Sequence, residues 1–169
     1  MTLYTERFRL VEEYLDHLDS VMVGIGDPFI QSRYLGFVTT AAVTVYELAI
    51  KDIFFSFSDK KHKILGSFSR GHFDRINGRI KIKDLKNEHV NMFGRKYVDK
   101  FEKMLEKKEK QFLKDGFGSI KSSYGNIITW RHTFVHEGVA PGTTNYPEIK
   151  NSYKLGKEII FCLDHAMRR

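Results

Sequence analysis

The sequence has few of the residues that cross-link or restrict a chain. It contains one cysteine and three prolines. The single Cys162 cannot form an internal disulfide, and it leaves no cysteine cluster with the spacing of a zinc site. These absences exclude a disulfide-stapled secreted domain and a cysteine-rich zinc module. We therefore expect a reducing compartment, and the cytoplasm is the expected location.

Long runs of uncharged apolar residues are also missing. A membrane-spanning helix needs about 20 such residues in succession, and no stretch approaches that length. Residues 1–18 are charged within their first turns, unlike the apolar core of a signal peptide. Repeats, low-complexity tracts and linkers are absent. We expect no export, no membrane partner, and one domain spanning residues 1–169, because that length suits a single core.

Apolar residues and positive charge are both plentiful. Hydrophobic residues make up 41% of the chain and aromatic residues 14%, which is enough for a packed globule. The net charge is +7 but uneven: residues 60–114 carry 17 Lys/Arg against 7 Asp/Glu, and the remainder carries 11 against 14. Such a basic segment suits a polyanionic partner. A solvated helical surface explains it equally well.

Apolar residues recur at helical spacing over most of the chain. The pattern predicts an all-α fold, an up-and-down helical bundle with about five principal helices. One or two short helices, at 60–68 and 84–93 with a loop between them, are expected in the glycine-rich region between residues 58 and 94. The first principal helix is expected to begin at a Thr5 cap and to stop at residues 24–28. The second is expected from 31 to 57, where a strand is the weaker option. The other three are expected from 96 to 114, from a Ser119 cap to Gly138, and from Pro147 to about 167.

The densest group of chemically active side chains is WRHTFVHEG, residues 130–138, at the end of a predicted helix. Each helical residue turns by about 100°, so His132 and His136 share a face while Arg131 flanks them. A fixed cation beside an imidazole that titrates near neutrality suits an anionic substrate. Trp130 and Phe134 are expected to turn toward the core and to hold this polar group rigid at its edge.

Two other interpretations of this stretch stay open. Histidines at i and i+4 can bind a metal, but position 133 is threonine where the H-E-x-x-H motif has glutamate, and no third ligand is evident. Alternatively, cationic residues at the C-terminal end of a helix complement the helix dipole, each contributing about 0.3–1 kcal/mol.

The same residues resemble the R-x4-H motif of the HEPN superfamily of all-α nucleases, and in particular the RiboL-PSP-HEPN type found in toxin–antitoxin and antiphage loci. Arg131 and His136 occupy the motif positions. His132 stands where most members of the superfamily have asparagine. The surroundings agree, because the motif ends a late helix, Gly138 follows, one more helix closes the chain, and a long apolar helix lies near the N-terminus. The resemblance covers nearly the whole chain.

This resemblance implies a homodimer with a composite active site and RNA cleavage that needs no metal or other cofactor. His136 would act as the base for a ribose 2′-hydroxyl, Arg131 would stabilise the phosphorane, and His132 would place the phosphate or protonate the leaving oxygen. The products would be a 2′,3′-cyclic phosphate and a 5′-hydroxyl. A toxin or antiphage defence effector, restrained by an antitoxin or inhibitor protein, is the implied role. The R-x4-H-x-Y variant of the motif is absent, because residue 138 is glycine.

Polar residues elsewhere have supporting roles in this hypothesis. Glu47 and Lys51 form either a surface salt bridge at i,i+4 or a buried pair in which Glu47 orients Arg131 or a histidine. The basic segment is expected to hold the RNA backbone without recognising its sequence. Its candidate residues are Arg70, Arg75 and Arg79. The remaining histidines are assigned no role: His17, His62, His72, His89 and His165.

Two further functions remain as alternatives to the ribonuclease. One is a non-catalytic HEPN-like domain that binds RNA or nucleotide, or that serves assembly, since a fold does not fix a function. The other is a helical adaptor that contacts only proteins, for which no salt-dependent affinity for RNA is expected.

Overall fold

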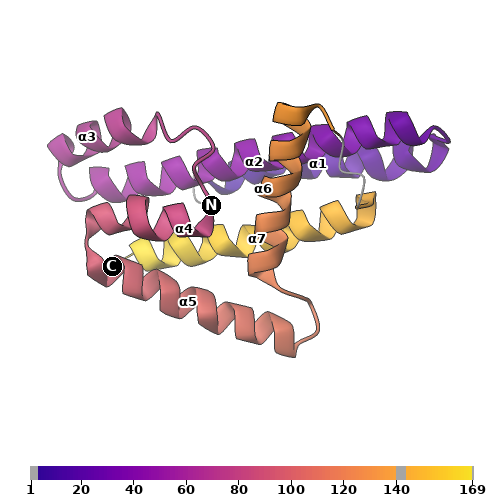
Figure 1. Ribbon diagram of the computed structural model, residues 1–169. Helices are drawn as coiled ribbons and strands as arrows, with labels where there is room; N and C mark the ends of the chain where they lie inside the picture. The colour runs from indigo at the N-terminus through magenta and orange to yellow at the C-terminus, as the bar shows by residue number, and fades with distance from the viewer. Residues whose placement is uncertain (1–3, 140–143, 169) are drawn as a thin grey trace.

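The computed structural model describes residues 4–139 and 144–168, and all regular elements in these ranges are helical (Figure 1). No strand occurs in them. The long helices are α1 (Thr5–Val21), α2 (Pro28–Asp59), α5 (Arg95–Lys114), α6 (Ile120–Glu137) and α7 (Tyr146–Met167). Between α2 and α5 lie α3 (Lys63–Phe73), the single turn α4 (Ile82–Asp84), a π-helical turn (Leu85–His89) and a 3-10 turn (Val90–Phe93). The predicted all-α class and its five principal helices are confirmed.

The helix ends follow ordinary capping chemistry. Asp27 accepts a hydrogen bond from the Phe29 amide at 2.8 Å at the start of α2, and Ser119 accepts one from the Ser122 amide at 3.0 Å at the start of α6. Gly138 ends α6 in the left-handed region, at φ 66°. The predicted roles of Ser119 and Gly138 are therefore confirmed.

Two predicted boundaries are wrong. Thr5 is the first residue of α1 rather than its cap, a position that Tyr4 occupies. The short helix expected at 60–68 begins at Lys63, after a His62 cap, and continues to Phe73. Glycine inside a helix costs only about 1 kcal/mol relative to alanine, so Gly66 and Gly71 do not end it. The loop after α6 was expected from 139 to 147, but residues 140–143 lie outside the described ranges.

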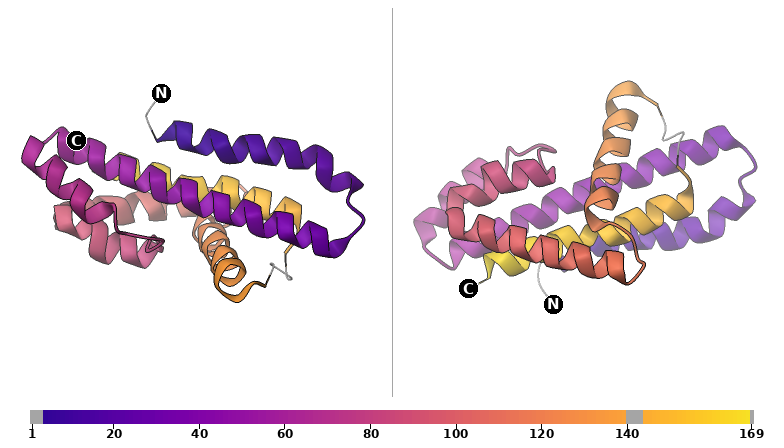
Figure 2. Two further views of the ribbon diagram at one scale, coloured as in Figure 1. Left: turned by 90° about the horizontal axis from the view of Figure 1, so that it is seen from above. Right: turned by 60° about the horizontal axis from the view of Figure 1, so that its bottom comes forward.

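Helix α2 is the centre of the bundle, with α1 and α7 along it and α6 crossing both α2 and α7 (Figure 2). Three buried tyrosines join these helices: the ring of Tyr46 stacks between those of Tyr124 and Tyr153, with centroids 5.3 and 5.7 Å away. The Tyr46 hydroxyl donates to the Tyr153 carbonyl at 2.6 Å. Gly156 makes room for that hydroxyl, because a Cβ there would overlap it. None of the described helices is long and apolar enough to cross a membrane.

The end of α6 lies close against the first half of α2. Gly36 of α2 allows this approach, since a Cβ at that position would overlap the Phe134 ring. Arg33 also donates a hydrogen bond to the Gly138 carbonyl at 3.3 Å. These contacts hold the last turns of α6, which carry the motif, in a fixed position on the bundle.

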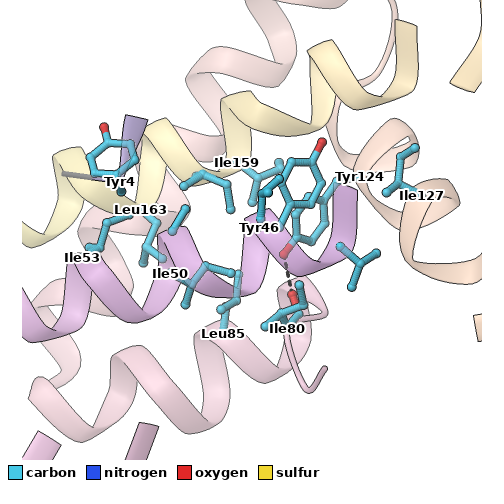
Figure 3. Close-up of a cluster of buried hydrophobic side chains, with 14 of the residues drawn as sticks. Tyr4, Tyr46, Ile50, Ile53, Ile80, Leu85, Tyr124, Ile127, Ile159 and Leu163 are labelled. Atoms are coloured by element: carbon cyan, nitrogen blue, oxygen red, sulfur yellow. Dashed lines mark hydrogen bonds between the residues drawn. The ribbon is translucent and has the colours of Figure 1, made fainter. Parts of the chain in front are cut away.

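The turn at residues 74–80, which follows α3, is attached to the other side of α6. The buried Tyr124 hydroxyl donates to the Ile80 carbonyl at 2.7 Å (Figure 3). Burial raises the pKa of Tyr124 well above its usual value, so the phenol stays protonated and remains a donor. The turn is thereby held next to the motif helix.

Candidate active site

The motif side chains differ in their exposure at the end of α6. Arg131 is half-buried, whereas His132 and His136 are exposed. The two imidazole rings lie side by side, with centroids 4.6 Å apart and planes inclined at 46°. Two exposed histidines on one face form a group that can donate or accept protons at the surface, as proton transfer to a bound substrate requires.

Arg131 lies against the turn at Gly78. Its Nη1 atom is 3.9 Å from the position that a Cβ of Gly78 would take. Gly78 has φ 78°, which other residues rarely adopt, so the turn needs glycine for its conformation. Within residues 4–139 and 144–168 the Arg131 guanidinium makes no hydrogen bond or ion pair. Its five N–H donors are therefore free for an anion such as a phosphate.

Glu47 and Lys51 of α2 hold the same turn. They form an ion pair at 2.9 Å, with their side chains 20% and 14% exposed, so the pair is half-buried rather than on the open surface. Glu47 accepts a hydrogen bond from the Gly78 amide at 2.8 Å, and Lys51 donates one to the Asp74 carbonyl at 3.2 Å. Glu47 makes no hydrogen bond or ion pair to Arg131 within the described ranges. It acts on Arg131 through the turn.

The three arginines expected to hold RNA are in two different environments. Arg70 donates two hydrogen bonds to the Asp59 carboxylate, at 2.8 and 2.5 Å. These bonds lower the pKa of the Asp59 carboxyl. The Arg70 guanidinium is therefore paired with a protein carboxylate rather than free to bind RNA. Arg75 and Arg79 are exposed and line a cavity beyond the end of α3. The structure therefore brings two of the three together.

Sequence analysis missed two histidines in that cavity. His72, in the last turn of α3, and His89, in the π-helical turn, line it together with Arg75 and Arg79. No spacing pattern could have identified them, because they lie on separate elements that meet only in the folded chain. The basic character of the segment was the only sequence signal.

Neither a metal centre nor a thiol nucleophile is indicated. The described residues contain no group of three or more His, Cys, Asp or Glu side chains that could hold a metal ion. Cys162 is buried, and burial raises the pKa of its thiol to about 11, which leaves little thiolate at neutral pH. Acid–base chemistry at the motif is left to histidine.

Exposed apolar side chains flank the motif on the neighbouring helix. We call this group the apolar patch. Large isolated apolar residues on a surface are ordinary, but a contiguous group of them indicates a contact site. The patch lies where α2 begins and α6 ends, which the Arg33–Gly138 hydrogen bond places together. Its residues are Phe29, Ile30, Tyr34, Phe37, Val135 and Val139.

Comparison with known families decides the classification. The family model described as RiboL-PSP-HEPN matches residues 2–168. The chain belongs to the RiboL-PSP-HEPN family. HEPN domains commonly bind RNA and form dimers, and many are ribonucleases, so an RNA-related function follows from membership. No curated protein and no solved structure matches this HEPN chain.

Proposed function

We propose that this HEPN chain is a metal-independent endoribonuclease that cleaves RNA through the ribose 2′-hydroxyl. The observation that supports it is the unpartnered, half-buried Arg131 on the same helix end as two exposed histidines. A guanidinium without a protein anion attracts a phosphate, and the adjacent imidazoles supply proton transfer. No other part of the described chain combines these three groups with the family motif.

The reaction needs only these side chains and the substrate. His136 takes the proton from the 2′-hydroxyl while its oxygen attacks the adjacent phosphorus. The pentacoordinate phosphorane carries extra negative charge, which the forked guanidinium of Arg131 stabilises. The bond to the 5′-oxygen then breaks, and His132 donates the proton that this oxygen needs. The products are a 2′,3′-cyclic phosphate and a 5′-hydroxyl, and DNA resists because it lacks the nucleophile.

A homodimer completes this site. Along α6, Arg131 and His136 are about 140° apart and offset by one turn, so they do not face one phosphate from the same helix. A two-fold axis near the end of α6 would bring the arginine of one chain opposite the histidine of the other, using a single sequence patch. The apolar patch beside the motif supplies the surface that such a contact would bury.

The biological role that fits this chemistry is a toxin or antiphage defence effector. A ribonuclease that uses the substrate's own hydroxyl as nucleophile attacks any accessible RNA, including that of its own cell. We therefore propose that an antitoxin or inhibitor protein restrains it, and that it works in the cytoplasm, where its substrate is.

The direct test is a cleavage assay on end-labelled RNA in the presence of EDTA. The purified protein should generate 2′,3′-cyclic phosphate ends and leave DNA of the same sequence intact. Arg131→Ala and His136→Ala should each lower the rate by about 10²–10⁴-fold. His165→Ala is the control, since His165 is an exposed histidine on α7 away from the motif. Full activity of the Arg131→Ala/His136→Ala double variant would refute the proposal.

One observation favours a second candidate, a domain that binds RNA without cutting it. The cavity lined by Arg75 and Arg79 is formed by one chain, whereas Arg131, His132 and His136 line neither this cavity nor three others found in the described ranges. In the same assay, RNA that is retained but stays intact would support this second function.

A further inference from the structure

The cavity beyond the end of α3 has the composition of a nucleotide site. It encloses about 320 Å³ between the last turn of α3 and the turns at residues 85–93. Arg75 and Arg79 supply two positive charges against the one negative charge of Glu88, and Ile76 and Met92 supply an apolar surface. Neither arginine has an ion pair within the ranges described, so both guanidinium groups are free for a ligand.

His89, which lines this cavity, has an unsatisfied polar atom. The side chain lines the cavity yet is only 3% exposed. Its Nε2 lies 2.7 Å from the Arg79 carbonyl oxygen, which can only accept, so Nε2 carries the hydrogen. Its Nδ1 is buried and has no hydrogen-bond partner in the structure. A buried polar atom without a partner costs free energy, and a ligand that supplies the missing partner recovers it.

These groups together fit a nucleotide better than a bare phosphate. A phosphate would bind the two guanidinium groups, as arginine pairs do elsewhere. The ribose or base would cover Ile76 and Met92, and a hydroxyl or amino hydrogen that reached the buried Nδ1 of His89 would supply its missing partner. Inorganic phosphate satisfies only the first of these contacts.

The cavity is connected to the motif through consecutive residues. Gly78 lies against the guanidinium of Arg131, and Arg79, the next residue, lines the cavity with its side chain and bonds His89 with its carbonyl. A strand whose reacting phosphate is held at Arg131 would need to cross only this turn to reach the cavity.

We propose that this cavity is a subsite that binds one nucleotide of the RNA strand, next to the phosphate at Arg131. The position of this subsite, next to the phosphate at Arg131, rests on the proposed function. The nucleotide-binding part rests on the cavity, the two free arginines and the unpartnered His89.

The test uses the full chain and a fluorescent 2′-O-methyl RNA oligonucleotide, which cannot be cleaved because its nucleophile is blocked. Binding is followed by fluorescence anisotropy. Gly71 lines the cavity, and a Cβ there meets nothing within 4 Å, so a new side chain fits without disturbing α3. Gly71→Glu places a negative charge at the cavity. Gly71→Gln introduces a side chain of the same shape that carries no charge.

Gly71→Glu and the double variant Arg75→Gln/Arg79→Gln should each weaken oligonucleotide binding by about tenfold or more, because charge complementarity to phosphate is lost. Gly71→Gln should weaken it less than Gly71→Glu. Lys154→Gln, which removes an exposed charge on α7, should stay within about twofold of the wild type. Wild-type affinity in both cavity variants, with an unchanged circular dichroism spectrum, would overturn the subsite.

Competition experiments distinguish a nucleotide from inorganic phosphate as the ligand of the cavity. Adenosine 5′-monophosphate should displace the oligonucleotide at lower concentration than inorganic phosphate does. If the mononucleotide binds the cavity but no cavity variant changes the affinity for the oligonucleotide, the assignment of the cavity to RNA is wrong. Arg131→Ala should fail to cleave RNA and should weaken oligonucleotide binding, because it removes a phosphate contact, but adenosine 5′-monophosphate should still bind the cavity. If the wild type fails to cleave while Gly71→Glu loses binding, the nuclease assignment falls and the nucleotide site stands.

Discussion

The end of α6 and the cavity beyond α3 are two polar regions built in opposite ways. The motif at residues 131–136 is recognisable in the sequence, but in one chain its histidines face solvent. The cavity has no sequence motif, yet one chain encloses it and buries His89 within it. Under our proposals, cleavage needs a second copy of the chain, whereas nucleotide binding needs only one.

The turn at residues 74–80 connects the two regions. Glu47, Lys51 and Tyr124 hold it by hydrogen bonds to Gly78, Asp74 and Ile80. Because Gly78 touches Arg131 and Arg79 touches His89, a change in this turn reaches both regions at once. Substitutions in either region, or in the turn, therefore test whether the two regions act separately or together.

The largest effect is expected from disrupting the apolar patch. Phe29→Asp/Phe37→Asp should leave the chain monomeric and lower RNA cleavage by about 100-fold or more, because two charges would be buried in the subunit contact. Binding of adenosine 5′-monophosphate in the cavity should not change. Analytical ultracentrifugation and the cleavage assay check this together.

A matched double variant on α3 serves as the control for that experiment. Ile64 and Phe68 are also exposed, at 74% and 62%, but lie outside the apolar patch. Ile64→Asp/Phe68→Asp should keep the dimer and the activity. A dimer that survives the patch variant would show that the subunits meet elsewhere.

A smaller loss is expected from Arg131→Lys. Lysine keeps the charge but loses the planar fork that bonds two phosphoryl oxygens, so cleavage should fall by about 10- to 100-fold. Nucleotide affinity of the cavity should remain at the wild-type value in anisotropy competition. If affinity falls in step with cleavage, the two regions are not separate sites.

Gly78→Ala should affect both regions to a similar extent. At φ 78° a Cβ costs about 1–2 kcal/mol of the free energy of unfolding, and the strained turn should displace both Arg131 and Arg79. Urea unfolding, cleavage and nucleotide binding should all decline. Gly125→Ala is the control: this glycine is exposed within α6 with open space around it, and alanine should stabilise the helix by up to about 1 kcal/mol. Loss of cleavage without loss of nucleotide binding would show that the turn does not position the cavity residues.

Tyr124→Phe should have the smallest effect. It removes the hydroxyl that bonds the Ile80 carbonyl and keeps the ring between its neighbours, so the free energy of unfolding should fall by about 1 kcal/mol. Both activities should persist, since the Glu47 and Lys51 bonds still hold the turn. The Tyr14 hydroxyl makes no hydrogen bond within the described ranges, so Tyr14→Phe should be neutral in the same unfolding experiment.

The sequence predicted those parts of the molecule that local chemistry determines. The five long helices follow from periodic apolar residues, and Ser119 and Gly138 mark the ends of α6. The motif was found because all of its residues lie within two turns of one helix. These features need no knowledge of tertiary contacts.

The remaining features depend on contacts between distant segments. Arg70 binds Asp59 across the α2–α3 junction, which no helical spacing suggests. The segment at residues 82–93 combines α, π and 3-10 turns, so its periodicity is broken and the orientation of His89 could not be anticipated. The bond from Glu47 to the Gly78 amide likewise joins two segments that the sequence does not relate.

Complementation between two inactive variants tests the composite site most directly. Arg131→Ala and His136→Ala are purified, mixed at equal concentration, allowed to exchange subunits, and assayed for RNA cleavage. If the arginine of one chain works with the histidine of its partner, half of the dimers regain one of two sites, and activity returns to about a quarter of the wild-type value. A mixture as inactive as its components, with subunit exchange demonstrated, would contradict the account.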